Sequence, residues 1–348
     1  MTLSNPPPFA PGSPPPVTPV QSPTTKLARR LAIGLLFGCL VFLVLALIGD
    51  IRQVSQRMLS FNWALYPLVF CLTLFNYTLR FFKWHYYLGL IGVRDFPLHQ
   101  SARLFVAGFP LAVTPGKVGE VFKGVWLNQK CGVSVARGVA VVLAERISDG
   151  LAVLGLSTVG VIAYPQYWPA FATVLALLLA IVMISQIRPL ALALLAVGER
   201  LPLIKRFVHS LREFYEGSFA LFRPLPTLAA VSLGMTSWLG EGAGFYLILL
   251  GLGQPAGWKT LSVAVFALSF SIVIGAASTL PGGLGASEAS IAGMLILLLG
   301  FQSDLAATAT LLIRFATLWF GVALGLITWA FSPDLLRLET THQPRPTP

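Results

Sequence analysis

The sequence has few charged residues and lacks the patterns of most soluble and catalytic classes. Charged residues make up 11% of the 348 residues and hydrophobic residues make up 56%, whereas a typical soluble protein is about 25% charged. The mean hydropathy is +0.79. The long apolar runs predict a polytopic membrane protein, whose backbone must be helical to satisfy its hydrogen bonds in lipid. The strict apolar/polar alternation of a membrane barrel is missing.

Cysteine and histidine are also scarce. The three cysteines, Cys39, Cys71 and Cys131, have no ligand spacing, and the four histidines are scattered, so we expect no metal site and no cofactor. The sequence has no Asp-x-Asp, no phosphate-binding P-loop and no nucleophile elbow. The net charge of +11 indicates loops that face anionic lipid. Nucleic-acid binding is not expected, because the basic residues are spread among apolar spans.

One motif occurs twice. Residues 114–120 read Thr-Pro-Gly-Lys-Val-Gly-Glu, and residues 280–288 read Leu-Pro-Gly-Gly-Leu-Gly-Ala-Ser-Glu. Each motif is a Pro-Gly turn inside an apolar region and is followed by an arginine 26 residues after its glutamate (Arg146, 146 − 120 = 26; Arg314, 314 − 288 = 26). The repeat predicts a duplicated unit with two broken helices that meet near the middle of a membrane.

The predicted fold is an all-α polytopic membrane protein with about six transmembrane helices and two re-entrant broken-helix hairpins, arranged as an inverted repeat. Such hairpins are tolerated only where protein or a wet cavity covers the open backbone. The hairpins are expected at 100–127 and 258–300. The crossings are expected at 31–49, 63–90, 133–164, 170–198, 226–252 and 305–331.

The predicted organisation has three parts. We expect a disordered proline-rich cytoplasmic tail at 1–25, a single membrane domain at 26–332 and a short cytoplasmic tail at 333–348. Within the membrane domain, repeat one is expected at about 63–164 and repeat two at about 226–332.

An amphipathic cytoplasmic linker is expected between the repeats, at 199–223. The positive-inside rule then places both termini in the cytoplasm, although Arg52 and Arg57 in the 50–60 loop fall on the outer side. We expect a multi-pass protein of the cytoplasmic (inner) membrane of a prokaryote.

The candidate site residues lie within or beside apolar segments. A charge at the bilayer centre costs about 2.5–3.5 kcal/mol, so these groups must be paired or face water. The glycines end one half-helix and let the next begin with free N–H groups, which can hold an anion such as phosphate. The predicted substrate site consists of Arg80, Gly116, Lys117, Gly119, Glu120, Glu145, Arg146, Asp149, Glu241, Gly282, Gly283, Gly285, Glu288 and Arg314.

Helical spacing suggests how some of these charges pair. Arg146 and Asp149 are three residues apart, so Arg146 can serve Asp149. Glu145 and Asp149 are four apart and repel, so Glu145 needs a cation from Arg314, Lys117 or a substrate.

Two structural alternatives stay open. The charges could form static ion pairs that lock the helices together. Glu120, Ser287 and Glu288 could cap their half-helices, with Ser287 the strongest candidate for a cap.

These motifs resemble the flippase-like family that contains the membrane half of lysylphosphatidylglycerol synthase and UPF0104-type membrane proteins. The resemblance covers about residues 30–332 and rests on residues 115–120, on the Glu-Arg-Ile-Ser-Asp sequence of 145–149, and on residues 281–285 with Glu288. In the full synthase this region moves an aminoacylated lipid between leaflets, and a separate soluble domain makes that lipid. The chain stops a few residues after the last predicted span, so the resemblance implies only the translocase-like role.

The first functional hypothesis is therefore a lipid translocase whose partners are membrane lipids, either anionic phospholipid or lipid-linked phosphate. A second is a membrane-embedded transferase that acts on lipid-phosphate substrates, with Glu145 or Asp149 as base. A third is a non-transporting partner of envelope-biogenesis enzymes that uses the proline-rich tail and the 199–223 segment.

Overall fold

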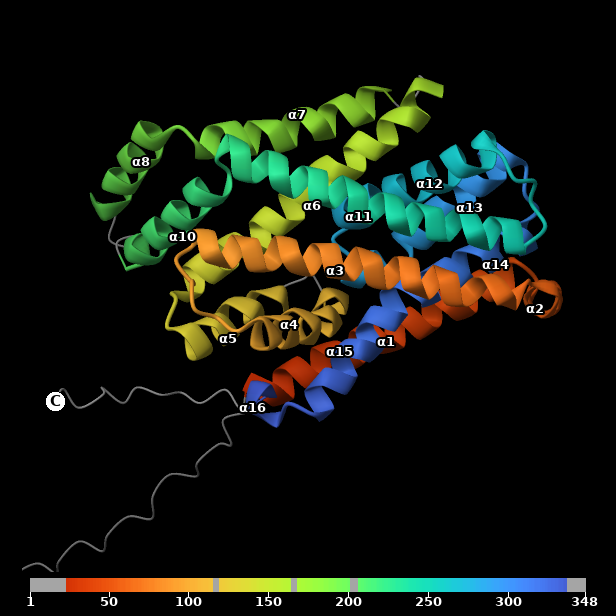
Figure 1. The fold of residues 1–348 in the computed structure, drawn as a ribbon, viewed down its shortest axis with the longest axis horizontal. Coiled ribbons are helices and arrows are strands. Elements are labelled where there is room, and N and C mark those ends of the chain that lie inside the picture. The colour runs from red at the N-terminus through yellow and green to blue at the C-terminus, as the bar shows by residue number, and fades with distance from the viewer. Residues whose placement is uncertain (1–22, 115–118, 164–167, 201–205, 337–348) are drawn as a thin grey trace, which may run out of the picture.

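In a computed structural model, the structure describes residues 23–114, 119–163, 168–200 and 206–336. The described residues form helices joined by turns, with no β-strand, and this confirms the all-α fold class. Figure 1 shows the helices lying mostly along one direction. The longer helices of the first part are α1 (Pro23–Ile48), α2 (Ile51–Ser60), α3 (Tyr66–Leu90), α4 (Leu98–Ala107), α5 (Phe122–Cys131), α6 (Val135–Ala163), α7 (Trp168–Ser185) and α8 (Arg188–Arg200). Those of the second part are α10 (Val208–Leu221), α11 (Pro224–Gly251), α12 (Trp258–Ala277), α13 (Ala286–Leu299), α14 (Ser303–Arg314) and α15 (Phe320–Ala330).

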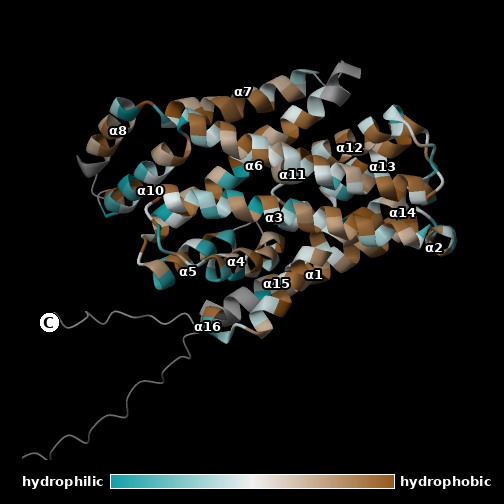
Figure 2. Cartoon of the chain, in the orientation of Figure 1, coloured by the Kyte–Doolittle hydropathy of each residue, from teal (hydrophilic) through white to brown (hydrophobic). Residues whose placement is uncertain are grey.

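Several of these helices are long and apolar enough to cross a membrane. Five described stretches qualify by length and composition: 31–48, 63–90, 258–277, 281–299 and 303–330. The pair α10 and α11, bent by 71°, makes a sixth if it counts as one span. The chain is therefore a multi-pass membrane protein, as Figure 2 illustrates with the mainly hydrophobic colouring of α1 and α7.

Two of the expected segments differ from the structure. The predicted 50–60 loop is the helix α2, because the Asp50 side chain accepts a hydrogen bond from the Arg52 N–H and caps its first turn. The crossing expected at 170–198, for which a break at Arg188-Pro189 was an alternative, is divided into α7 and α8 at residues 186–187, so that Pro189 lies in the first turn of α8, where proline is tolerated.

The two predicted hairpins also differ from each other. In the first, α4 and α5 have ten residues each, or about 15 Å, too short to cross a bilayer. In the second, α12 has 20 residues, and the stretch 281–299 that contains α13 is itself apolar and long enough to cross. The helices of the second hairpin are therefore longer than those of the first. Re-entrant placement of both hairpins stays a prediction.

The break in the second hairpin needs glycine. Gly282, Gly283 and Gly285 have φ angles of 61°, 68° and 84°, in the left-handed region that residues with a Cβ avoid. A Cβ on Gly283 would also lie 2.9 Å from the Cα of Gly275 on α12. The second copy of the Pro-Gly motif thus ends α12 and lets α13 begin against it.

Equivalent helices of the two units have equivalent neighbours. Helix α3 packs on its counterpart α11, and the two breaks, η2 (Phe109–Val113) and η5 (Pro281–Gly283), contact each other. In the same order along the chain, α4 corresponds to α12, α5 to α13, and α6 to α14 with α15. The contact of α6 with α12 is therefore matched by that of α15 with α4, and the contact of α5 with α6 by that of α13 with α14. This pattern agrees with a duplicated unit, while the inverted direction of the two units across a membrane stays a prediction.

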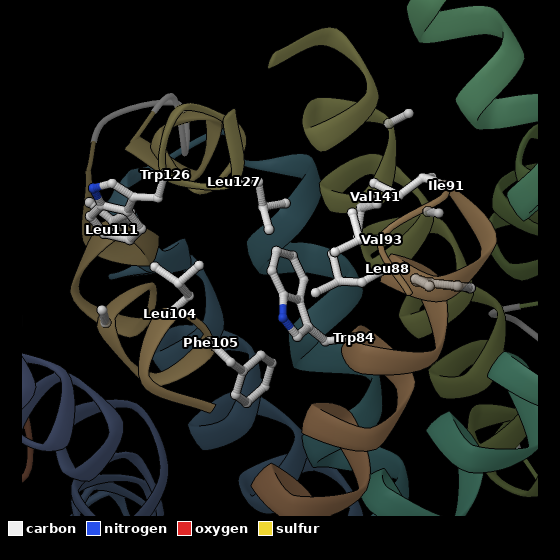
Figure 3. Close-up of a cluster of buried hydrophobic side chains, with 14 of the residues drawn as sticks. Trp84, Leu88, Ile91, Val93, Leu104, Phe105, Leu111, Trp126, Leu127 and Val141 are labelled. Carbon is white, nitrogen blue, oxygen red and sulfur yellow. The ribbon is translucent and has the colours of Figure 1, made fainter. Parts of the chain in front are cut away.

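A large apolar cluster holds the first hairpin against α3. Figure 3 shows Trp84 of α3 facing Phe105 of α4, with Leu88 and Leu127 beside it. Trp84 is 0% exposed, and its ring lies 6.4 Å from that of Phe105. Burial of aromatic side chains of this size fixes the position of the short helices that lead into the first break.

Candidate functional site

A cavity of about 160 Å³ lies where the two breaks meet. It has room for several water molecules or for one phosphate-sized group. Its walls come from both units: α3, α5, α6 and the first break from one, and α11, α12, the second break and the π-helical turn at Phe315–Trp319 from the other.

Seven of the predicted site residues line this cavity: Arg80, Glu120, Arg146, Glu241, Gly282, Gly283 and Arg314. Glu145, Asp149 and Glu288 are buried beside it without lining it. Gly119 and Gly285 lie at the turns that lead into α5 and α13. Gly116 and Lys117 lie outside the described residues.

The two arginines at the repeated spacing make equivalent ion pairs. Arg146 Nε lies 3.4 Å from Glu120 Oε2, and Arg314 Nε lies 2.5 Å from Glu288 Oε1. Each arginine thus pairs with the glutamate 26 residues before it. Arg314 also lies 3.3 Å from the Gly282 carbonyl, to which it donates a hydrogen bond across the second break.

Asp149 has a different partner from the one that the spacing predicts. It pairs with Lys83, which is 1% exposed, and it lies 3.6 Å from Arg80. The predicted Arg146–Asp149 pair is wrong, because Asp149 faces α3 while Arg146 faces the first break. Lys83 was missed, although its position three residues after Arg80 on an apolar helix is a signal that the two share a face.

Glu145 is paired within the first unit. Lys123 Nζ of α5 lies 3.4 Å from Glu145 Oε2, and the two side chains are 5% and 1% exposed. The ammonium also lies over the rings of Trp84 and Phe105. The cation was predicted to come from Arg314, Lys117 or a substrate. The Arg314 part of the prediction is wrong because Arg314 is held by Glu288, and Lys117 lies outside the described residues.

The beginning of α13 already holds an anionic group. Glu288 Oε2 accepts a hydrogen bond of 2.6 Å from the Gly285 N–H, so Glu288 caps this half-helix and pairs with Arg314 at the same time. The predicted cap by Ser287 is wrong, because its hydroxyl donates to the Ser271 carbonyl on α12 instead. Near the second break, an anion in the cavity would therefore meet the Arg314 guanidinium rather than free N–H groups at the beginning of α13.

Two aromatic residues that sequence reasoning missed complete the walls. Trp238 lies under Arg80, with the guanidinium carbon 5.4 Å from the ring centre. The Tyr77 hydroxyl donates to the Thr317 carbonyl, at 2.6 Å, inside the π-helical turn that follows Arg314. Such turns leave a carbonyl without its usual helical partner and are frequent at functional sites. A signal was present, since Tyr77 precedes Arg80, and Trp238 precedes Glu241, by three residues on one helix face.

Residues 31–325 match the family described as "Lysylphosphatidylglycerol synthase TM region". The chain belongs to this family. The match confirms the resemblance drawn from the two Pro-Gly motifs and the 145–149 sequence.

Two relatives of this family member come from archaea. A UPF0104 membrane protein of Methanothermobacter thermautotrophicus is 26% identical over 313 residues, which cover 84% of this chain and 91% of the relative. A UPF0104 membrane protein of Methanocaldococcus jannaschii is 26% identical over 181 residues, which cover 51% of this chain and 74% of the relative. No solved structure matches the chain.

The cavity of this family member is lined by arginines from both units and by the carboxylates of Glu120 and Glu241. Among the described residues, Arg80, Arg146 and Arg314 line the cavity, and Lys123 reaches it from α5. Glu145 and Asp149, the two acids that a transferase would use as base, are held by lysines and do not line it. Within the part of the chain that the structure describes, no group of three His, Cys, Asp or Glu side chains could hold a metal ion. The guanidinium groups from both units are suited to binding an anion reversibly.

Proposed function

We propose that this protein is a lipid translocase that moves a phosphate-bearing or aminoacylated lipid between the leaflets of the cytoplasmic membrane. The observation that carries the proposal is the cavity at the meeting point of the two breaks, with Arg80 and Arg146 from one unit and Arg314 from the other on its walls. Guanidinium groups bind phosphate oxygens through paired hydrogen bonds. A phosphorylated headgroup would occupy the cavity while its acyl chains stay in the bilayer.

The family supports the lipid part of the proposal. Its description names the synthase of an aminoacylated phospholipid. The duplicated packing around the cavity also supports it, because transporters built from inverted repeats bind their substrates near the bilayer midplane between the repeats. In this proposal both termini lie in the cytoplasm of a prokaryotic cell, and envelope-biogenesis enzymes make or consume the lipid.

The first test is native mass spectrometry of the detergent-purified chain. Wild type, Arg146→Ala and Arg314→Ala would be compared for the lipids that each retains. Arg57→Ala is the matched control, because Arg57 makes a similar pair with buried Asp304 at 2.8 Å but does not line the cavity. The proposal expects one class of anionic lipid on wild type and on Arg57→Ala, and its loss from the two cavity variants.

The second test is transport itself. The purified protein would be reconstituted into liposomes that contain a fluorescent phosphatidylglycerol. The fraction of this lipid that is accessible to an external quencher would be followed with time. Transport by wild type that is lost in Arg314→Ala supports the proposal. If all four proteins retain the same lipids and none moves phosphatidylglycerol or a polyprenyl-phosphate lipid, the arginines are structural locks and the non-transporting alternative takes the place of the translocase.

A further inference from the structure

Glu241 differs from the other buried acids around the cavity. It lies in the middle of α11, is 5% exposed and lines the cavity. No described lysine, arginine or histidine lies within ion-pairing distance of it. The other buried acids of this region each have a cationic partner: Glu120, Glu145, Asp149 and Glu288.

The charges of the described residues around the cavity are balanced only when Glu241 is ionised. The described cations are Arg80, Lys83, Lys123, Arg146 and Arg314, and the described acids are the four paired ones and Glu241. Five positive charges thus face five negative charges. When Glu241 is protonated, the set has an excess of one positive charge, which a monoanion neutralises.

The groups that face Glu241 link its ionisation to anion binding. On α3 these are Arg80 and the Tyr77 hydroxyl, on α6 the Asp149 carboxylate, and at the end of α14 Arg314. Helix α12 contributes no titratable residue to the cavity walls. Arg80 and Arg314 favour the ionised carboxylate, and these are the guanidinium groups that an anionic headgroup would engage. A bound anion therefore cancels their support and adds its own repulsion at short range in a poorly screened site.

We propose that Glu241 takes up one proton when a monoanionic headgroup enters the cavity, so that lipid and proton are bound together. This rests on the proposed function and adds its coupling ion. The proton comes from water and converts the carboxylate to a carboxylic acid, and no bond to the lipid forms or breaks. A metal cation is a poor ligand here, because Arg80 and Arg314 repel it.

The test is calorimetric titration of the full chain in detergent with a short-chain phosphatidylglycerol, whose phosphodiester stays a monoanion throughout. Titrations in two buffers of different ionisation enthalpy, from about pH 6 to about pH 9, give the number of protons taken up per lipid bound. For wild type we expect uptake that approaches one proton at the alkaline end, with affinity falling by up to about tenfold per pH unit there. Glu241→Gln, which mimics the protonated acid, should bind without proton uptake and with a flat pH profile.

Two further variants keep the result interpretable. Glu241→Asp keeps a carboxylate and should keep the proton uptake. Glu213→Gln removes a carboxylate that pairs with Arg137 away from the cavity, and it should behave as wild type does. Two outcomes would overturn the inference without affecting the proposed translocase function. One is lipid binding by wild type without proton uptake at any pH, and the other is proton uptake that persists in Glu241→Gln. Sodium dependence in place of pH dependence would also overturn it. Absence of phosphatidylglycerol binding in every protein would count against the proposed function itself.

Discussion

The buried ion pair of Lys123 and Glu145 provides a quantitative test of how strongly water screens charges in the interior. Both side chains are almost fully buried, and their charged atoms are 3.4 Å apart. Glu145 Oε1 has no hydrogen-bond partner in the described structure. The structure therefore assigns this pair to holding α5 against α6, and removing one partner should leave a buried charge without compensation.

The size of the effect depends on which partner is removed. Breaking a buried ion pair costs about 3–5 kcal/mol, and Lys123→Met should cost this full amount because Lys123 is the only described residue that forms an ion pair with Glu145. In Glu145→Gln the ammonium keeps its contacts with the rings of Trp84 and Phe105, worth about 0.5–2 kcal/mol. We therefore expect a loss of about 2–4 kcal/mol for that variant. The double variant buries no charge and should be less destabilised than the sum of the two.

The assay is a double-mutant cycle on the free energy of unfolding, measured by titration with a denaturing detergent and followed by tryptophan fluorescence. We expect a coupling energy of about 2–3 kcal/mol. The half-exposed pair of Arg188 and Glu216, 3.3 Å apart, is the matched control and should give at most about 1 kcal/mol. A coupling energy below about 0.5 kcal/mol for Lys123 and Glu145 would show that water screens the pair, and its structural role would then be refuted.

Two further predictions concern other parts of the fold. Lys130 donates a hydrogen bond to Asp334 at 2.9 Å and holds the pKa of Asp334 below its usual value. The resulting stabilisation of the fold is complete above the unfolded pKa of about 3.9 and is lost as the pH falls through the lower folded pKa. Asp334→Asn should therefore lower the free energy of unfolding by at most about 1 kcal/mol at neutral pH and not at all in strong acid, as measured by the same detergent titration across pH. Gly283→Ala should lower the free energy of unfolding by more than about 2 kcal/mol, because the alanine would need a left-handed backbone and would clash with Gly275. Gly293 lies in a helix with open space around it, so Gly293→Ala should be neutral or stabilising by up to about 1 kcal/mol. Equal unfolding midpoints for the two variants would contradict this account of the break.

Much of the architecture was predictable because the membrane restricts the choices. An apolar run of the right length must be helical, so the helix at Tyr66–Leu90 and the apolar part of Pro23–Ile48 from residue 31 follow from composition. The first residues of Pro23–Ile48 were expected in the tail at 1–25. The second Pro-Gly motif predicted the break before α13 for a similarly local reason. The lengths of the two hairpins were not predictable, because apolarity does not distinguish a short buried helix from one that crosses.

The site was predicted in its members better than in its pairing. Equal spacing identified Arg146 and Arg314, since duplication copies separations along the chain. The partner of Asp149 was assigned to its own helix, and the structure gives it to Lys83 on α3. Which helix lies opposite a charged residue depends on tertiary packing, and no local pattern in the sequence contains that information.

The pairing within each unit has a mechanical consequence. Every central ion pair described joins two residues of one unit, as Arg146 with Glu120 and Arg314 with Glu288 do. Where α3 meets α11, the described residues place apolar contacts and the cation–π contact of Arg80 with Trp238, but no ion pair. The polar links from Tyr66 and Tyr77 to the other unit are single hydrogen bonds to backbone carbonyls. One unit can therefore slide or rock against the other without separating a buried pair of charges. The electrostatic cost of such a motion falls on the more exposed ion pairs at the outer ends of the bundle.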